Sequence, residues 1–263
     1  MREDEAVTCY FRRLSATAFE PTDHVAGAWR VDEQHIAPVL GLMAHLVEAE
    51  HAARRPQSPL VLARAGYDIL GVIPMERFEV AMRVVRPGRT IELVEATLSH
   101  DDRPAVALRA WMLQRTDTSS LAGVALPQMP PIDGLPAWSP GDVWPGGAVR
   151  SIDTHREHIE PGRARTWLRP RVRLLDEPVS ARARMLGALD FANGVATRAA
   201  PEQALYPNVD LTASLFREPV GEWIGLDTAV SFGPDGIGLT QSVLSDQTGP
   251  VGSSSQTLTV RPR

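Results

Sequence analysis

The 263-residue sequence predicts an α+β protein made of two similar halves, each with one long helix followed by several antiparallel strands. A proline-rich stretch separates the halves, and the residues on its two sides agree in order and spacing. Hydrophobic residues make up 43% of the chain, which is enough for a sizeable core. We therefore expect an N-terminal unit at residues 1–115, a linker at 116–150 and a C-terminal unit at 151–263.

Each predicted helix begins near a proline, Pro38 in the first half and Pro178 in the second, because proline is favoured in a first helical turn. The residues that follow keep a helical spacing, with three apolar positions and then an acidic one. The two sets are Val39, Met43, Leu46 and Glu50 in the first half, and Val179, Ala183, Leu186 and Asp190 in the second. Both helices should bury this face against a sheet.

The predicted strands follow the helices, where the apolar period falls to two residues. From Glu76 and Glu222 onward the halves match at an offset of 222 − 76 = 146. Turn residues separate the strands at 86–88, 233–236 and 246–250. The shared order of helix and strands indicates an internal duplication.

Charge and cysteine content exclude several classes of protein. A net charge of −5 leaves no basic surplus for a nucleic-acid backbone. A single cysteine, Cys9, allows neither an internal disulfide framework nor a thiolate zinc cluster. We also expect no metal. The N-terminus lacks a signal-peptide pattern, and no apolar run is long enough to insert into a membrane. We expect a cytoplasmic protein.

Asp190 and Gln256 are the two candidate catalytic residues. Asp190 continues an apolar helix face, where burial would raise its pKa into the range of a general base. The alternative places Asp190 in solvent, at a helix end signalled by Asn193 and Gly194. Gln256 shares a strand face with apolar residues, and a structural hydrogen bond is its alternative role. Its counterpart in the first half is Ala110, so we expect one site rather than two.

His35 lies just before the first predicted helix, where backbone N–H groups could hold an oxyanion or a thioester carbonyl. A packing or capping role is the alternative. A serine-hydrolase elbow is disfavoured, because Gln256 follows the serines at 253–255 where that motif requires glycine.

Several segments in order resemble the thioesterase-like double-hotdog family related to bacterial thioesterase II. In the first half they are residues 34–38 before the helix, 64–74 and 85–88. In the second half they are the segment that bears Asp190, residues 207–212, 222–223 and 244–257. The resemblance covers nearly the whole chain outside the linker. It implies a double hotdog, in which a curved antiparallel sheet wraps a helix in each half.

The same resemblance implies an acyl-CoA thioesterase that needs no cofactor, with an acyl-CoA or related acyl thioester as substrate. The family's site joins an Asp, a Ser or Thr, and a Gln around a water. Asp190 and Gln256 match, but the middle position falls on Asn208, so Thr212 is a substitute candidate. Substrate contacts are expected at His35, Ala37 and Pro38, where the family's glycines are replaced by Ile36 and Ala37.

Two alternatives stay open at this point. A non-catalytic acyl-CoA-binding protein is the first, because Asn208 replaces the family's hydroxyl. A hotdog hydratase or dehydratase is the second, and it would need a histidine such as His35 opposite the carboxylate. A homo-oligomer is also open, although a double hotdog already contains the paired units.

Overall fold

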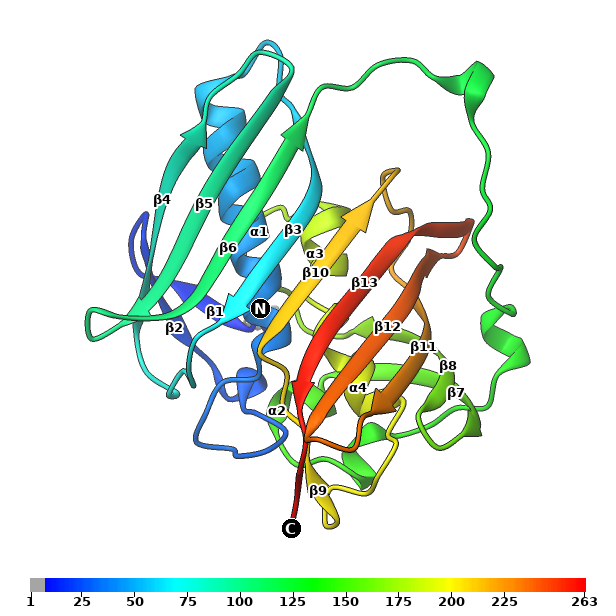
Figure 1. The fold of residues 1–263 in the computed structure, drawn as a ribbon. Coiled ribbons are helices and arrows are strands. Elements are labelled where there is room, and N and C mark those ends of the chain that lie inside the picture. The colour runs from blue at the N-terminus through cyan, green and yellow to red at the C-terminus, as the bar shows by residue number, and fades with distance from the viewer. Residues whose placement is uncertain (1–7) are drawn as a thin grey trace, which may run out of the picture.

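One antiparallel sheet of twelve strands organises the molecule (Figure 1). The computed structural model describes residues 8–263, so the charged start of the chain, on which the signal-peptide argument rests, lies outside the described residues. The strand order is β1-β2-β4-β5-β6-β3-β10-β13-β12-β11-β8-β7. The first six positions come from the first half of the chain and the last six from the second half. The predicted α+β double hotdog is confirmed.

The duplication is visible in the strand boundaries. Three consecutive strands recur with starts 146 residues apart (224 − 78, 237 − 91 and 249 − 103). The pairs are β4 Phe78–Arg86 with β11 Ile224–Phe232, β5 Ile91–His100 with β12 Ile237–Asp246, and β6 Arg103–Leu113 with β13 Gly249–Thr259.

The two halves meet where β3, Val61–Ile69, pairs with β10, Asp210–Leu215. This antiparallel seam makes the two half-sheets continuous. The outer strands are β1 Phe11–Arg13 and β2 Ala18–Pro21 at one edge, and β7 Ile152–Glu160 and β8 Arg163–Pro170 at the other. A separate small sheet joins β9, Ala204–Leu205, to β14, Arg261–Pro262.

The connector between β6 and β7 contains short helical turns and no strand. They are η2 Ser119–Leu121, η3 Ile132–Gly134, η4 Pro140–Asp142 and α2 Gly147–Arg150, and η1 Asp23–Val25 is a similar turn near the N-terminus. The connector passes around the outer edge of the second half before the chain returns to the sheet (Figure 1).

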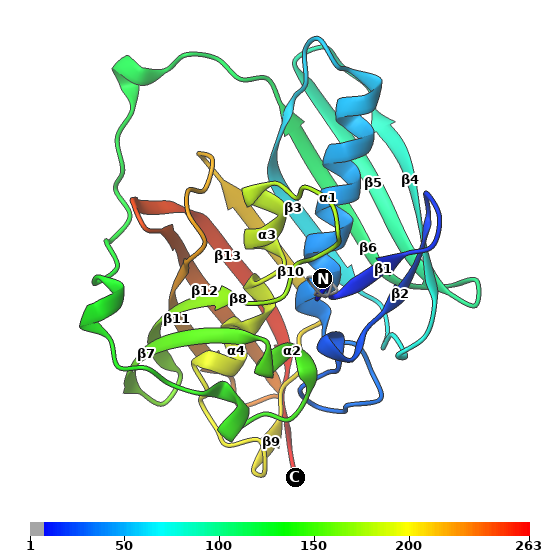
Figure 2. The same ribbon diagram turned by 180° about the vertical axis from the view of Figure 1, so that it is seen from behind.

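The helices lie together on one face of the sheet (Figure 2). Helix α1, Ile36–Arg54, has Pro38 in its first turn, and every residue from Ala37 to Val47 is buried. A helix that is buried on all sides needs no polar face, which explains the nearly continuous apolar run in this part of the sequence.

The second predicted helix is wrong in length and start. Helix α3 covers only Ala181–Leu186, and Ser180, not Pro178, lies at its N-cap and accepts a hydrogen bond from the Ala183 N–H. A 3-10 turn, η5 Leu189–Phe191, and a short helix, α4 Ala192–Val195, follow. Asp190 therefore lies in a turn after the helix rather than on its apolar face.

Close packing of α1 against α3 accounts for the break. A Cβ atom added at Gly41 would lie 2.7 Å from the Gly187 Cα and 2.9 Å from the Ala183 carbonyl oxygen. Only glycine permits this approach of two backbones, and glycine also favours the end of a helix. The apolar periodicity did not predict the end of α3, because it depends only on the spacing of apolar residues and not on the glycine between Leu186 and Asp190.

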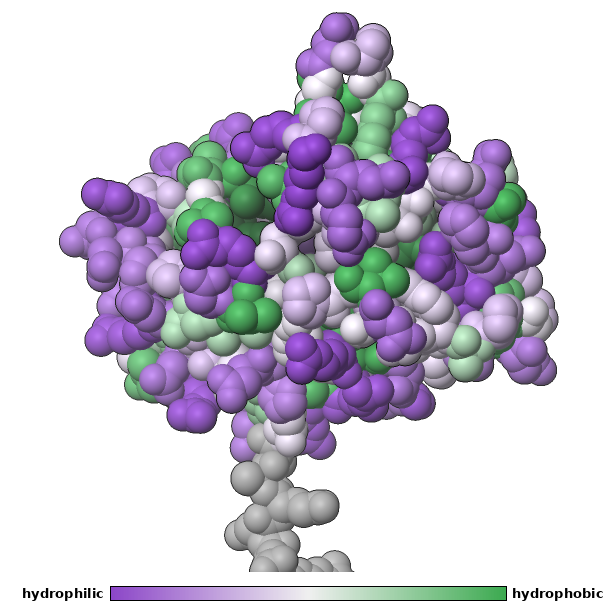
Figure 3. Space-filling view, turned by 90° about the horizontal axis from the view of Figure 1, so that it is seen from below, coloured by the Kyte–Doolittle hydropathy of each residue, from purple (hydrophilic) through white to green (hydrophobic). Residues whose placement is uncertain are grey.

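Among residues 8–263, no helix is long and apolar enough to cross a membrane. The end of the molecule that carries β9 and the C-terminus is mostly hydrophilic, with hydrophobic residues gathered in a hollow (Figure 3). The segments that line the cavity described below lie at this end.

Replacing Gly41 with alanine tests the helix contact. Alanine is the better helix former by about 1 kcal/mol, so an uncrowded site would gain stability. Because the added methyl group meets the Gly187 backbone, we expect a loss of about 1–3 kcal/mol in the free energy of unfolding, measured by urea denaturation. Gly71→Ala is the control, since a Cβ there has no atom within 4 Å. Equal stability of the two variants would contradict the close contact.

Candidate functional site

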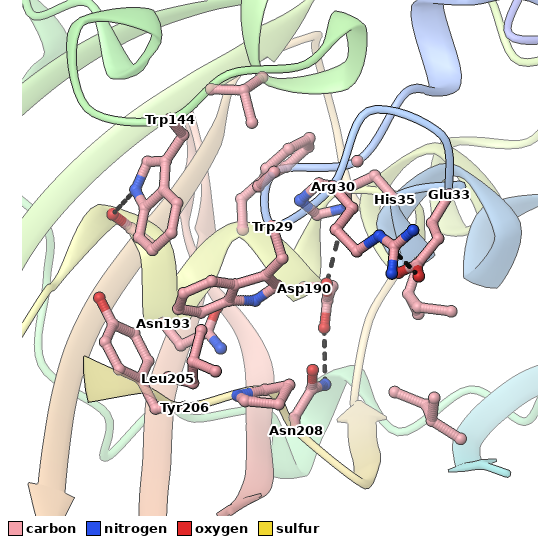
Figure 4. Close-up of a pocket in the computed structure, with 18 of the residues that line it drawn as sticks. Trp29, Arg30, Glu33, His35, Trp144, Asp190, Asn193, Leu205, Tyr206 and Asn208 are labelled. Carbon is pink, nitrogen blue, oxygen red and sulfur yellow. Dashed lines mark hydrogen bonds and ion pairs between the residues drawn. The ribbon is translucent and has the colours of Figure 1, made fainter. Parts of the chain in front are cut away.

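The Asp190 carboxylate is the centre of the site (Figure 4). Its side chain is about nine-tenths buried, and two amide groups donate hydrogen bonds to the same oxygen, Oδ1. The Asn208 Nδ2 lies 2.6 Å from Oδ1 and the Gln256 Nε2 lies 3.1 Å from it. The other oxygen, Oδ2, faces His35 at 3.6 Å from Nδ1, which is longer than a hydrogen bond. Oδ1 is therefore held in place, and Oδ2 is the oxygen that remains for chemistry.

Burial raises the pKa of Asp190 to about 7, while the hydrogen bond from Asn208 acts in the opposite direction. Desolvation disfavours the charged carboxylate, and neutral amide donors offset only part of that cost. A carboxylate with a pKa near 7 can accept a proton close to neutral pH. Asp190 is thus buried in a cavity wall rather than exposed at a frayed helix end.

His35 occupies the N-cap of α1, where its Nδ1 accepts a hydrogen bond of 3.1 Å from the Ala37 N–H. Burial lowers the pKa of His35 to about 4, so the ring is neutral at pH 7. A neutral imidazole with an accepting Nδ1 carries its proton on Nε2. His35 therefore combines the predicted capping role with an N–H donor in the cavity wall.

This cap changes what the start of α1 can offer to a substrate. The Ala37 N–H already donates to His35, and Pro38 has no N–H group. The Val39 N–H belongs to the helical ladder, so Ile36 holds the remaining backbone donor of this turn. The sequence predicts backbone N–H donors at the start of this helix, and the histidine and the proline leave fewer of them available than the start of the helix would otherwise offer.

Asn208 and Gln256 contact the carboxylate, and Thr212 does not. Thr212 is paired with Ser255 across the sheet, so it lies on the face opposite to Gln256. There it borders a shallow outer groove together with Asp227 and Ser214. The structure thus leaves Asn208 as the residue in the place of the family's hydroxyl.

The structure also corrects the internal counterpart of Asp190. The N-caps His35 and Ser180 are 180 − 35 = 145 residues apart, so Asp190 corresponds to His45 rather than to Glu50. His45 Nε2 is 2.7 Å from Glu177 Oε1, and Arg13 also binds Glu177. Glu50 instead pairs with Arg54. At the counterpart position the Glu177 carboxylate lines a separate cavity, but both of its oxygens are already bound by Arg13 and His45.

A cavity of about 500 Å³ opens beside Asp190. Three aromatic residues from distant segments form much of its wall: Trp29 before α1, Trp144 in the connector, and Tyr206 before β10. The Trp29 ring packs edge-on against the other two, with centroids 4.8 Å from Trp144 and 5.1 Å from Tyr206. None of the three is among the site residues that the sequence predicts. A tryptophan inside a proline-rich connector was the available signal, because connectors rarely need a large apolar side chain.

The described part of the chain contains no recognisable metal-binding site. Within residues 8–263, no three His, Cys, Asp or Glu side chains are grouped so that they could hold a metal ion. The polar groups around Asp190 are two amides and one imidazole, which suit hydrogen bonding to a neutral ligand.

Each half of the chain matches the model of a known protein-family domain. Residues 25–113 match the model of the acyl-CoA thioesterase N-terminal domain, and residues 124–260 match that of the C-terminal domain. The chain belongs to the acyl-CoA thioesterase family. It is a thioester hydrolase, and the predicted resemblance to thioesterase II is confirmed. A search of curated proteins gave no match.

Solved structures share the fold over the full length. A TesB protein from Mycobacterium avium subs paratuberculosis is 17% identical, covers 96% of each chain and has a TM-score of 0.64. The acyl-CoA thioesterase II TesB2 from Mycobacterium marinum is 15% identical, with coverage of 96% of this chain and 95% of that chain and a TM-score of 0.69. A conserved hot dog protein of unknown function from Alicyclobacillus acidocaldarius is 13% identical over 95% of each chain, with a TM-score of 0.73.

The Asn208 hydrogen bond can be tested by titration. Asn208→Leu removes a donor that favours the charged carboxylate, so the pKa of Asp190 should rise above about 7 by roughly 1–2 units. The ¹³C chemical shift of the Asp190 carboxyl group, followed against pH, measures it. Thr212→Val is the control and should leave the titration unchanged. An unchanged midpoint in Asn208→Leu would show that this contact does not stabilise the carboxylate.

Proposed function

We propose that the protein hydrolyses an acyl-CoA by direct attack of water, with Asp190 as the general base. The observation that carries the proposal is a buried carboxylate on a cavity wall, with one oxygen held by two amides and the other open toward His35. Because Asp190 is the carboxylate held in this way, we propose that the protein has one active site. We also propose that the protein acts in the cytoplasm, which the single cysteine supports.

The first step is proton transfer. Asp190 Oδ2 takes a proton from water as the oxygen of that water bonds to the thioester carbonyl carbon. Asn208 and Gln256 act as positioning residues, because both donate to Oδ1 and keep Oδ2 turned to the water. Gln256 does not line the cavity, so a direct contact between its amide and the water is not part of this mechanism.

The second step is collapse of the tetrahedral intermediate. The negative oxygen formed from the carbonyl accepts a hydrogen bond from His35 Nε2–H, and Ile36 N–H is a second donor on the same wall. The C–S bond then breaks, and the leaving sulfur takes the proton from Asp190. The products are the free acid and CoA, and the carboxylate is regenerated.

The replacement of a hydroxyl by Asn208 is compatible with this chemistry. A Ser or Thr in this place would supply one hydrogen-bond donor to the carboxylate, and the Asn208 amide supplies such a donor at 2.6 Å. A donor retained at this position favours catalysis over a protein that only binds acyl-CoA. The binding-only alternative becomes one outcome of the hydrolysis experiment.

Hydrolysis with Asp190→Asn tests the base. Purified protein is offered acyl-CoAs of increasing chain length while free thiol is recorded. The variant should lose about 10²- to 10⁴-fold in rate, because general-base catalysis contributes that much. In the wild type kcat/KM should rise with pH and level off above about 7, where the carboxylate is ionised.

The control for this experiment is Asp235→Asn, which changes an exposed aspartate in a turn. Binding of acyl-CoA without thiol release by the wild type would establish the binding-only function instead. Full activity in Asp190→Asn would remove Asp190 as the base.

His35→Asn separates the two roles of this histidine. The asparagine oxygen can still accept from the Ala37 N–H, but the variant has no donor in the place of Nε2–H. We expect kcat to fall about 10²- to 10³-fold while the urea midpoint changes little. His158→Asn, at an exposed position, is the matched control. Unchanged kcat in His35→Asn would assign the oxyanion to other donors.

A further inference from the structure

Asn193 is a nearly buried polar residue of the cavity that the proposed mechanism does not use. Asn193, in α4, has a relative exposure of 9%, and its side chain makes no hydrogen bond to any described residue. It lines the same cavity as Asp190. In Figure 4 its amide lies on the side of the cavity where Trp29 and Tyr206 are found. Its nitrogen and oxygen remain accessible from the cavity, and a ligand that covers them without supplying a hydrogen-bond partner would leave a buried, unpaired amide, which is costly.

The walls around this amide are aromatic and fixed in position. Trp144 Nε1 donates to the Gly194 carbonyl oxygen at 3.0 Å, and Tyr206 Oη donates to the Ala199 carbonyl oxygen at 3.1 Å. Both polar atoms are thus used by the backbone. The two rings are almost fully buried, Trp144 at 3% and Tyr206 at 0% exposure, so they back the wall against which the partly exposed Trp29 ring faces the cavity. Flat rings held in this way suit a planar or cyclic group, which also loses less conformational freedom on binding than a flexible chain.

We propose that this end of the cavity selects an acyl group that carries a ring and a hydrogen-bonding substituent, and that Asn193 recognises the substituent. The inference rests on the proposed function, since it identifies the acyl part of the thioester. A site of this kind rejects a substrate without the polar group, because the amide would then be buried without a partner. A plain alkyl chain would meet the same penalty.

The connector has a function in this arrangement. Trp144 lies in the proline-rich segment between the halves, and its hydrogen bond to Gly194 attaches that segment to α4. Gly194 is adjacent to Asn193 and four residues from Asp190. The connector therefore closes the acyl pocket next to the proposed base, and Trp144 is a specificity-determining residue.

The test compares kcat/KM for three kinds of CoA thioester: the three hydroxyphenylacetyl-CoA isomers, phenylacetyl-CoA, and octanoyl-CoA, which matches phenylacetyl in carbon number. We expect the best hydroxylated isomer to exceed phenylacetyl-CoA by about 10-fold or more, and phenylacetyl-CoA to exceed octanoyl-CoA. Asn193→Leu and Asn193→Ala should bring the hydroxyl preference to about one. Trp144→Leu should remove the preference for a ring over the octanoyl chain.

These ratios do not depend on how much of a variant is folded, because both substrates compete for the same active molecules. Gln241→Leu removes an exposed amide on the outer face and should leave every ratio unchanged. A wild type that prefers octanoyl-CoA, or an Asn193→Leu variant that keeps the hydroxyl preference, would overturn the proposal.

Failure of the proposed function would look different. If no thioester released thiol, binding of the same compounds to the Asp190→Asn protein, measured by calorimetry, would still decide the question. Tighter binding of a hydroxylated isomer that Asn193→Leu abolishes would support the pocket without the catalysis. Equal binding of all the thioesters would remove the pocket proposal as well.

Discussion

The contact between Gly41 and Gly187 sets the geometry on which the site depends. It lets two buried helices approach until their backbones touch, with no side chain between them. His35 lies six residues before Gly41, and Asp190 lies three residues after Gly187. The short spacing of the helices is therefore what brings a residue from each half of the chain to within 3.6 Å at the cavity. A larger residue at Gly41 would separate them, because its Cβ would lie 2.7 Å from the Gly187 Cα.

Desolvation then gives Asp190 its chemical character. The same burial raises the pKa of the carboxyl group and lowers that of the imidazole. At pH 7 the Asp190 carboxyl group is therefore only partly ionised, and the His35 ring is neutral. The pair is not a salt bridge. Two amide donors keep one carboxylate oxygen in place without removing its basicity, whereas a cationic neighbour would have lowered the pKa far below neutral. A neutral histidine beside it can donate a hydrogen bond without repelling or neutralising the base.

The two halves share the same scaffold, but only the second half contains the proposed catalytic carboxylate, Asp190. At the counterpart of Asp190 the first half has His45, which is bound to Glu177, and Arg13 completes that cluster. An ion-pair cluster of this kind is already satisfied by its own partners. In the second half, the cavity beside Asp190 is lined by Trp144 of the connector, which packs against Trp29. The two ends of the molecule thus differ in chemistry although their strands coincide at a constant offset.

The sequence by itself determined the repeat, the three strands that recur at the 146-residue offset and the acidic residue of the site. It did not determine β1, β2, β7 and β8, which precede the helices instead of following them. Alternating apolar residues and turn signals are local, so they predicted the strands on both sides of the 146-residue offset, and an acidic residue among apolar ones indicated Asp190. Only the tertiary structure decided that α3 ends at Leu186, before Gly187, that Asn208 rather than Thr212 reaches the carboxylate, and that Trp144 lines the cavity. These features depend on which surfaces meet in space, and contacts between residues tens or hundreds of positions apart leave no local period in the chain.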